Sequence, residues 1–384
     1  MDRCPCGNLW LDPAAPWPAG GHVPYCRPCW RAAGGGRGAS PDRLPPRRVR
    51  ADGTLLLREP NGGRSFNPSV LKVGGRWLMA YRTGWAGSRV AVCEVDPQTG
   101  VVGPSVPLDL SHPRAAVGAE DPRLFLFRGR VHVSFTAFDG QRPSVLYARL
   151  AGLRVEQMFE PHYPARRPWE KNWAFFEGGD GHLYCVYSID PVHTVLRVDG
   201  EYTTVAGQTD SPVVGWVGGH LRGGAPPVLV DGEYWHWFHG ARDDGEPNRR
   251  YSVGVYTFDP EPPFRVRRWL THPVAWANES DWHASGNYCR VAFPGGAVLD
   301  NGRWRVAVGV HDRWCELWGW DHAAVRRLLG LGTAYRGKCL HLGKRTEFRE
   351  GCGGWSCRHV CGAGEPVAVP GGVCQSCERW QADG

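Results

Sequence analysis

Apolar runs closed by glycine turns recur along the middle of the chain. In one such unit, Leu124–Phe127 leads into a turn at Gly129 and then into a second strand from Arg130 onward. The intervals between successive turn glycines are 54, 52, 51 and 70 residues, and these glycines are Gly75, Gly129, Gly181, Gly232 and Gly302. A hairpin repeated about every 50 residues suits a four-stranded blade. The pattern predicts an all-β fold, a five-bladed β-propeller over residues 53–335.

Composition agrees with this fold and argues against nucleic acid and membranes as binding partners. The chain has 384 residues, of which 42% are hydrophobic, and its 52 Gly and 32 Pro suit turn-dense β-structure. The formal net charge of +7 comes from arginines spread along the chain, so a nucleic-acid partner is not expected. The first residues lack the apolar core of a signal peptide, and no stretch is apolar for the length of a membrane span. We expect a cytoplasmic protein that does not enter the membrane.

Cysteines gather at both ends of the chain in pairs with metal-ligand spacing. Fourteen Cys in a chain with no visible secretion signal favour reduced thiols and metal sites over disulfides. Residues 1–31 and 350–384 are each predicted to form a zinc-ribbon-like module, with two structural Zn²⁺ ions in all and a protein partner as a further use of these ends. The ligands would be Cys4, Cys6, Cys26, Cys29, Cys357, Cys361, Cys374 and Cys377. His22 in place of one thiolate, or unconnected buried cysteines, are the alternatives.

The rest of the chain divides simply. Residues 32–52 are mostly Gly, Ala, Pro and Arg, which is typical of a linker between the first module and the propeller. Cys93, Cys185, Cys289 and Cys315 lie in strand-like runs and are predicted to be small core residues.

Asn67-Pro68 and Asp121-Pro122 occupy the same position in successive repeats. In a propeller this position belongs to the inner strand, which lines the central funnel. We therefore expect Asn67 and Asp121 to face one cavity from adjacent blades. Taken singly, each fits an ordinary turn residue before proline.

Charged residues in three later repeats point to the same funnel. Lys171 lies among aromatic residues, and lysines make up only four of the 45 basic side chains, so this position favours a compact ammonium group. A salt bridge to Glu170 or to a neighbouring blade is the alternative. Arg222, His239 and Asp312 would add a cation, a titratable ring and a carboxylate, although a histidine after Phe is also typical of a core.

Taken together, these motifs resemble glycoside hydrolase family 130. The resemblance covers about residues 60–320 and rests on Phe66-Asn67-Pro68 with Tyr81-Arg82, Glu120–Arg123, Lys171-Asn172, Gly223–Pro227 with His239-Gly240, and Phe293–Gly296 with His311-Asp312. Members of that family are five-bladed propellers, mainly inverting β-mannoside phosphorylases with some hydrolases, and have relatives among β-mannosyltransferases. The terminal Cys modules and the aromatic residues around Lys171 depart from the typical member.

The resemblance implies roles for single residues and an oligosaccharide or glycoside substrate. Asp121 matches the catalytic proton donor, which protonates the glycosidic oxygen while phosphate or water attacks C1 from the opposite face. The substrate-binding positions would be Asn67, Arg82, Arg123, Lys171, Asn172 and Asp312. Inorganic phosphate, as co-substrate, would contact Lys171, Arg222 and His239. A hydrolase would instead need a second carboxylate as base.

Two other functions fit the same residues. A glycosyltransferase of glycan assembly would use Asp121 and hold a sugar phosphate or nucleotide sugar in the positive funnel. A non-catalytic glycan-binding propeller would dock partners through its Cys modules. In either case Trp85, Trp169, Trp173 and Trp235 are candidates for stacking on sugars, although most Trp in strands belong to cores.

Overall fold

The structure is a computed structural model of the 384-residue chain. It describes residues 54–57, 65–84, 87–213, 216, 219–243, 249–270, 273–276, 291–312, 314–333 and four short C-terminal strands. These four strands pair as two small sheets and are β23 (Lys338–Cys339) with β26 (Trp380–Gln381), and β24 (Gly354–Cys357) with β25 (Val367–Pro370). The predicted zinc ligands lie outside the described residues, apart from the backbone of Cys357, so the zinc modules stay a prediction.

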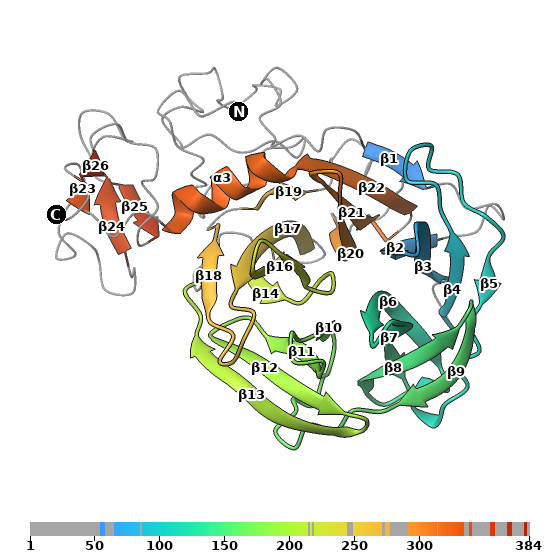
Figure 1. The fold of residues 1–384 in the computed structure, drawn as a ribbon. Coiled ribbons are helices and arrows are strands. Elements are labelled where there is room, and N and C mark those ends of the chain that lie inside the picture. Colours follow the sequence, from blue (N-terminus) through green and yellow to red (C-terminus); the bar gives the residue numbers. More distant parts are fainter. Residues whose placement is uncertain are drawn as a thin grey trace.

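Five antiparallel sheets stand around a common axis (Figure 1). The first three blades follow the chain strictly, each running from the inner strand outward. They are β2 (Ser65–Val73), β3 (Arg76–Thr83), β4 (Arg89–Glu94) and β5 (Val106–Pro107); β6 (Gly118–Phe127), β7 (Arg130–Phe138), β8 (Pro143–Ala151) and β9 (Arg154–Phe159); and β10 (Ala174–Glu177), β11 (Leu183–Ser188), β12 (Val192–Asp199) and β13 (Tyr202–Asp210). A short 3₁₀ helix, η2 (Pro113–Ala115), precedes blade two. The predicted all-β, five-bladed propeller is confirmed.

Blades four and five are less regular. Blade four splits its inner strand into β14 (His220–Arg222) and β15 (Val228–Val230) and continues with β16 (Glu233–Asp243), β17 (Arg249–Phe258), β18 (Val266–Trp269) and β19 (Ala275–Trp276). Blade five has β20 (Ala292–Asp300), β21 (Arg303–Val310) and β22 (Trp314–Asp321), and its outer strand is β1 (Thr54–Leu57), the first described strand of the chain. The ring is therefore closed within one sheet by strands from its two ends.

Turn chemistry explains the repeated hairpins. The five turn glycines have φ between 67° and 78°, a region that favours glycine. In four of the five turns the preceding residue also has positive φ, as in Asn301 and Asp231, which is the type I′ geometry that matches the twist of paired strands. The glycine spacing thus marks the inner hairpin of each blade.

Tryptophans fill the space between blades four and five. Trp235, Trp237, Trp304 and Trp320 are all buried there, and the rings of Trp237 and Trp320 stack with centroids 4.9 Å apart. Aromatic side chains of this size each bury about 150–250 Å², so they dominate the packing of this interface. Trp235 and likewise Trp173 belong to the core, whereas Trp169 is exposed and Trp85 lies outside the described residues. Cys93, Cys185 and Cys315 are buried, as expected.

Two glycine pairs allow neighbouring inner strands to touch. A Cβ on Gly223 would meet the carbonyl oxygen of Asn172 at 2.0 Å, and one on Gly295 would meet that of Pro68 at 2.3 Å. These glycines therefore bring blade four against blade three and blade five against blade one.

A buried hydrogen-bonded chain also joins blades three and four. The Gly224 N–H donates to His236 Nε2 at 3.4 Å, so His236 Nδ1 carries the proton and donates to the Tyr256 hydroxyl at 2.9 Å. That hydroxyl in turn donates to His193 Nε2 at 2.9 Å. All three side chains are fully buried, and the chain satisfies polar groups that water cannot reach.

In the described part of the chain, the propeller is followed by a helix. α3 (His322–Thr333) contacts β18 and β22, and Asp321 caps its first turn by accepting from the Ala324 N–H at 2.7 Å. Within the described residues, no helix has the length and apolar character needed to cross a membrane.

Candidate active site

Four acidic or amide residues with unusual backbone geometry meet where the inner strands begin. Asn67, Asp121, Asn172 and Asp312 have φ of 51°, 54°, 65° and 51°. Asn and Asp tolerate the left-handed region better than other residues with a side chain, but Asn67 and Asp121 also precede prolines, which disfavours helical conformations. A β-bulge interrupts the pairing at Asn67 and again at Asp121. Such strain collects at functional sites in proteins.

Asp121 is buried and its carboxylate is held by groups from blade one. Asn67 Nδ2 donates to Asp121 Oδ1 at 2.7 Å, and the Arg82 guanidinium lies 3.8 Å from the same oxygen. The structure thus brings Asn67 and Asp121 together from adjacent blades. Both contacts hold this carboxyl oxygen in place.

Glu120 forms ion pairs with cations from the two neighbouring blades, next to Asp121. Its Oε1 accepts from Arg82 at 2.9 Å, and its Oε2 accepts from Lys171 Nζ at 3.0 Å. Lys171 therefore pairs with the neighbouring blade and not with Glu170. The buried Glu170 carboxylate instead accepts from Trp173 Nε1 at 2.7 Å and from the Tyr187 hydroxyl at 2.9 Å, which fixes the segment before β10.

Arg123 is buried at the centre of the ring and contacts groups from several blades. Its guanidinium donates to the Gly224 carbonyl at 2.7 Å, the Asp121 carbonyl at 2.9 Å and Asn172 Oδ1 at 2.8 Å, and packs over Phe293 with 5.2 Å to the ring centre. These partners come from four blades. Burial lowers the pKa of Arg123 to about 10, against the effect of the nearby Asp121 charge, so the side chain stays protonated at neutral pH.

Asp312 follows β21 and completes the acidic side of the site. Burial raises the pKa of Asp312 to about 6, and the negative charges of Asp121 and Glu120 act in the same direction. Arg82 and a hydrogen bond from Asn67 oppose this rise. Asp312 therefore titrates closer to neutrality than an ordinary aspartate.

Blade four contributes a cation and an aromatic cluster. Arg222 and His239 are paired across β14 and β16, and Arg222 donates to the Tyr251 hydroxyl at 3.2 Å. His239 is buried between the rings of Tyr251 and Phe293. Burial, and then the positive charges of Arg222 and Arg123, hold the pKa of His239 well below its usual value. The ring is therefore neutral at neutral pH and can both donate and accept a hydrogen bond.

Sequence reasoning did not assign the bridging role of Glu120 or the places of Tyr251 and Phe293. Glu120 precedes Asp121 directly, and that adjacency was a usable signal. Tyr251 and Phe293 look like ordinary strand aromatics, because their role depends on contacts with His239 from other strands.

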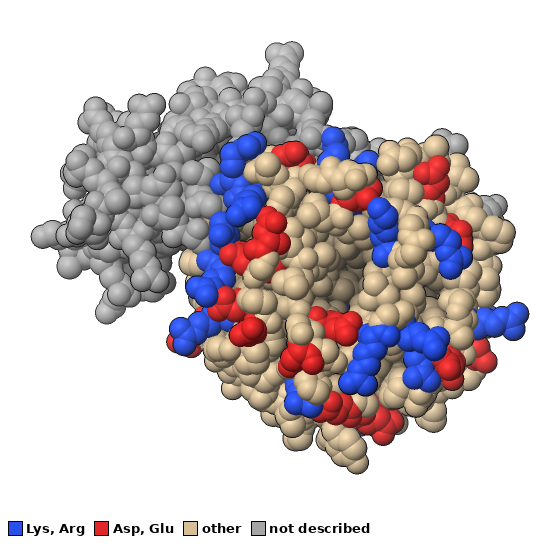
Figure 2. Space-filling view, in the orientation of Figure 1, with Lys and Arg blue, Asp and Glu red and all other residues tan. Residues whose placement is uncertain are grey.

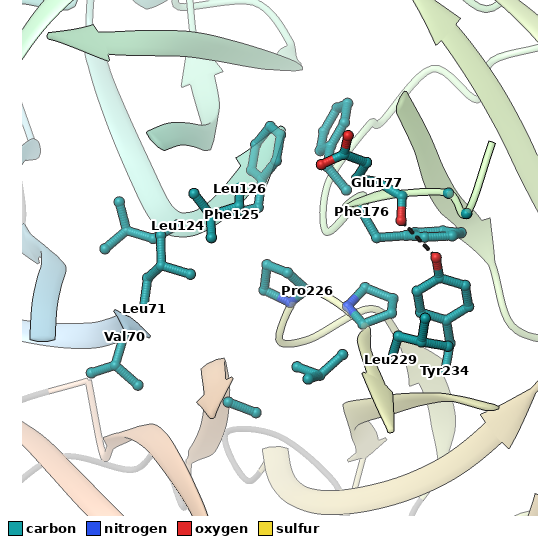
Figure 3. Close-up of a pocket in the computed structure, with 16 residues that line it drawn as sticks. Val70, Leu71, Leu124, Phe125, Leu126, Phe176, Glu177, Pro226, Leu229 and Tyr234 are labelled. Carbon is teal, nitrogen blue, oxygen red and sulfur yellow. Dashed lines mark hydrogen bonds between the residues drawn. The ribbon is translucent and has the colours of Figure 1, made fainter. Parts of the chain in front are cut away.

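A pocket lies beyond these residues along the inner strands. It has a volume of about 310 Å³, and its lining follows the site residues along each inner strand, as Leu124–Leu126 follows Asp121. The centre of the ring is hollowed in the space-filling view (Figure 2), and the close-up shows apolar side chains from several blades around the pocket, with Glu177 among them (Figure 3). This axial pocket is apolar, unlike the charged site at the other end of the strands.

No group of three or more His, Cys, Asp or Glu side chains in the described part of the chain is arranged to bind a metal ion. The chemistry available among the described site residues is that of carboxyls, amides, cations and one neutral imidazole. This set suits proton transfer to a leaving oxygen beside a bound anion.

Comparisons with known proteins concern the fold. No protein-family model matches the sequence, and no curated protein matches it either. Solved structures do match. A glycosyl hydrolase from Bacteroides ovatus is 17% identical, with a TM-score of 0.54 over 67% of this chain and 84% of that one. The β-1,2-mannobiose phosphorylase from Listeria innocua, in complex with β-1,2-mannobiose, is 14% identical, with a TM-score of 0.53 over 76% and 96%.

A third match comes from the GH130 family of mannoside phosphorylases, which contains glycoside hydrolases that target β-1,2-mannosidic linkages in Candida mannan. It is 15% identical, with a TM-score of 0.53 over 67% of this chain and 84% of that one. At these identities the likeness concerns the backbone architecture. The chain therefore has the five-bladed β-propeller fold of these carbohydrate-active proteins.

Proposed function

We propose that the chain is an inverting glycoside phosphorylase acting on β-mannosides or related glycans, with Asp121 as the general acid. The observation that carries the proposal is the position of Asp121, held by Asn67 and Arg82 beside the Glu120 carboxylate that pairs with Lys171. The fold shared with a β-1,2-mannobiose phosphorylase supports the choice of substrate class.

In the proposed reaction, protonated Asp121 gives its proton to the glycosidic oxygen. A phosphate oxygen attacks C1 from the opposite face as the C1–O bond breaks, which yields a sugar 1-phosphate of inverted configuration and a free alcohol. Asn172 and Asp312 would contact sugar hydroxyls from blades three and five. Arg123 serves by holding Asp121 and Asn172 in place, because its described hydrogen bonds go to protein groups.

Phosphate needs cations and donors on the side opposite the acid. Lys171, Arg222 and His239 are the candidates, since Lys171 and Arg222 are partly exposed and carry positive charge. The neutral His239 ring adds a donor that does not depend on pH in the neutral range.

Hydrolysis is the second candidate. It is favoured by the additional carboxyls near Asp121, because a hydrolase needs a base to activate water. The negative charges of Asp121 and Glu120 both raise the pKa of Asp312, so these three carboxyls lie near one another. The same experiment distinguishes the two reactions.

The test is formation of sugar 1-phosphate from β-linked manno-oligosaccharides with inorganic phosphate, for the native protein and for Asp121→Asn. We expect phosphate-dependent product whose rate falls by about 10²–10⁴-fold in the variant, because the amide cannot supply the proton. Asp199→Asn, at the exposed end of β12, is the matched control and should keep native activity.

Three other outcomes would redirect the proposal. Release of free sugar without phosphate would show a hydrolase. Product from a sugar donor and an acceptor alone would show a transferase. Glycan binding with no turnover in any of these assays would show a binding propeller.

A further inference from the structure

We propose that the axial pocket binds a small organic cation, an ammonium group attached to an apolar body, with the Glu177 carboxylate as its counter-ion. The pocket lies along the inner strands, away from the charged residues of the candidate active site. The proposal goes beyond the proposed function, because it concerns a second site and does not depend on which reaction the first one performs.

The walls of the pocket are apolar and come from all five blades. They include Val70 on β2, Leu126 on β6, Phe176 on β10, Leu229 on β15 and Ala297 on β20. Leu229 is 50% exposed, so it lies where the pocket meets solvent (Figure 3). The volume of about 310 Å³ is within the range of small-molecule sites, which are mostly apolar with a few polar groups. The pocket therefore favours a ligand with a compact apolar body.

Among the described lining residues, Glu177 alone carries a charge. It is half-buried at the end of β10, and its Oε2 accepts from the Arg128 N–H at 3.1 Å. Within the described part of the chain, no Lys, Arg or His side chain forms an ion pair with this carboxylate. The Arg128 guanidinium packs over the Phe127 ring instead, 5.0 Å from its centre. The pocket thus presents a negative charge that no described cation balances.

These two features together specify the chemistry of the ligand. An ammonium group can form a charge-assisted hydrogen bond with the Glu177 carboxylate. The aromatic rings of Phe176 and Tyr234 lie beside it, with centroids 4.6 Å apart, and the Tyr234 hydroxyl donates to the Glu177 carbonyl at 2.6 Å. Aromatic rings attract cations and also pack against an apolar body. A neutral ligand lacks the charge-assisted bond, and Glu177 repels an anionic one.

The pocket is separate from the candidate active site because Arg123 lies between them. Arg123 directly precedes Leu124, which lines the pocket. Its guanidinium reaches from blade two to blades three and four, where it donates to Asn172 Oδ1 at 2.8 Å and to the Gly224 carbonyl at 2.7 Å. A ligand in the pocket therefore leaves Asp121 accessible, and we expect it to bind without competing with a glycoside.

The test compares three ligands with the same apolar body by ligand-observed NMR titration at pH 7. They are 4-phenylbutylamine, 4-phenylbutanol and 4-phenylbutyrate, whose head groups are an ammonium, a hydroxyl and a carboxylate. We expect the amine to bind with a Kd of about 1 mM or lower, as is ordinary for a ligand of this size. The alcohol should bind about 10-fold more weakly, because it lacks the charge-assisted bond, and the carboxylate more weakly still.

Three variants identify the residues responsible. Glu177→Gln removes the charge but keeps an oxygen that can accept from the Arg128 N–H, so the amine should lose about 10-fold in affinity while the alcohol changes less than about threefold. Asp180→Asn is the matched control, because Asp180 is exposed on the same hairpin and does not line the pocket. Leu229→Ser, at the exposed mouth, should weaken all three ligands alike by at least about threefold, since it removes apolar contact.

Several outcomes would overturn the proposal. They are equal binding of the three ligands, no amine binding at up to about 10 mM, ten times the expected Kd, an amine preference that survives Glu177→Gln, and unchanged affinities in Leu229→Ser. Turnover of a β-mannoside in the presence of the amine gives a further readout. An unchanged rate supports a separate site, whereas competition would place the amine in the candidate active site. If no β-mannoside is turned over at all, the proposed function falls and the binding results still decide this proposal.

Discussion

At the scale of single residues, Arg123 carries the largest expected loss of stability. Arg123→Met would leave three acceptors without their donor, the buried carbonyls of Asp121 and Gly224 and the half-buried side-chain oxygen of Asn172. Each unsatisfied buried group costs about 1–3 kcal/mol, so we expect the free energy of unfolding to fall by about 3 kcal/mol or more. Urea denaturation followed by Trp fluorescence measures this fall.

Arg130→Met is the matched control, because Arg130 is exposed at the start of β7 in the same blade. Its effect should stay within about 0.5 kcal/mol, as for most surface changes. Equal effects of the two substitutions would show that the three hydrogen bonds of Arg123 do not join the blades.

How much of the site could be read from sequence differs between residues. Asn67 and Asp121 could be matched because each precedes a proline at the same place in the repeat. The burial of Arg123 could not be predicted, since its acceptors lie on three blades that only the closed ring brings together. The resemblance assigned Asp312 to sugar, and its coupling to Asp121 became visible only from their shared environment.

At the scale of elements, the buried histidines at the interface of blades three and four make stability depend on pH. Burial lowers the pKa of His193 to about 4 and that of His236 well below its usual value. The unfolded chain binds these protons at about pH 6.5, so between pH 6.5 and 4 it holds more protons than the folded protein. Stability is therefore complete above pH 6.5 and lost as pH falls, by up to about 1.4 kcal/mol per pH unit for each histidine.

Urea denaturation at a series of pH values between 7 and 4 checks this slope. His193→Gln should lower the unfolding free energy at pH 7 and make its decline toward pH 4 shallower. His220→Gln is the control, because His220 is exposed on β14 and its loss should not change the slope. A native slope that stays the same in His193→Gln would refute the assignment.

The hairpins were the elements most open to prediction, since each depends on a local turn glycine. The histidine and tyrosine chain was not, because His193, His236 and Tyr256 lie on three strands and none has a distinctive neighbour in sequence. The split inner strand of blade four also escaped prediction. It lies in the interval from Gly181 to Gly232, which at 51 residues has about the same length as those of the regular blades and so gives no sign of the split.

At the scale of the whole molecule, ring closure by β1 governs the integrity of the propeller. Deletion of residues 1–58 removes the partner of β22 and leaves an unpaired strand edge on blade five. We expect a lower Tm, by about 2–4 °C for each kcal/mol lost, and concentration-dependent aggregation. A deletion of residues 1–50 keeps β1 and is the control; equal Tm values for the two proteins would show that β1 is dispensable.

Five blades were predictable because the repeat is counted along the chain, but the pairing of β1 with β22 was not. Sequence periodicity reports neighbours within a blade, and this contact joins the two ends of the repeat array. Only the requirement that an open ring must close somewhere could have suggested it.

The pairing of β1 with β22 also determines when the propeller can close during synthesis. Leu57 and Trp314 are 257 residues apart, the difference between 314 and 57, so β1 leaves the ribosome long before its partner exists. At about 5–20 residues per second this wait lasts roughly 13 to 50 s. During it, the first blades can form from local hairpins, while the earliest strand stays unpaired. The last step of folding is therefore the pairing of β1, the first propeller strand to be synthesised, with β22, the last.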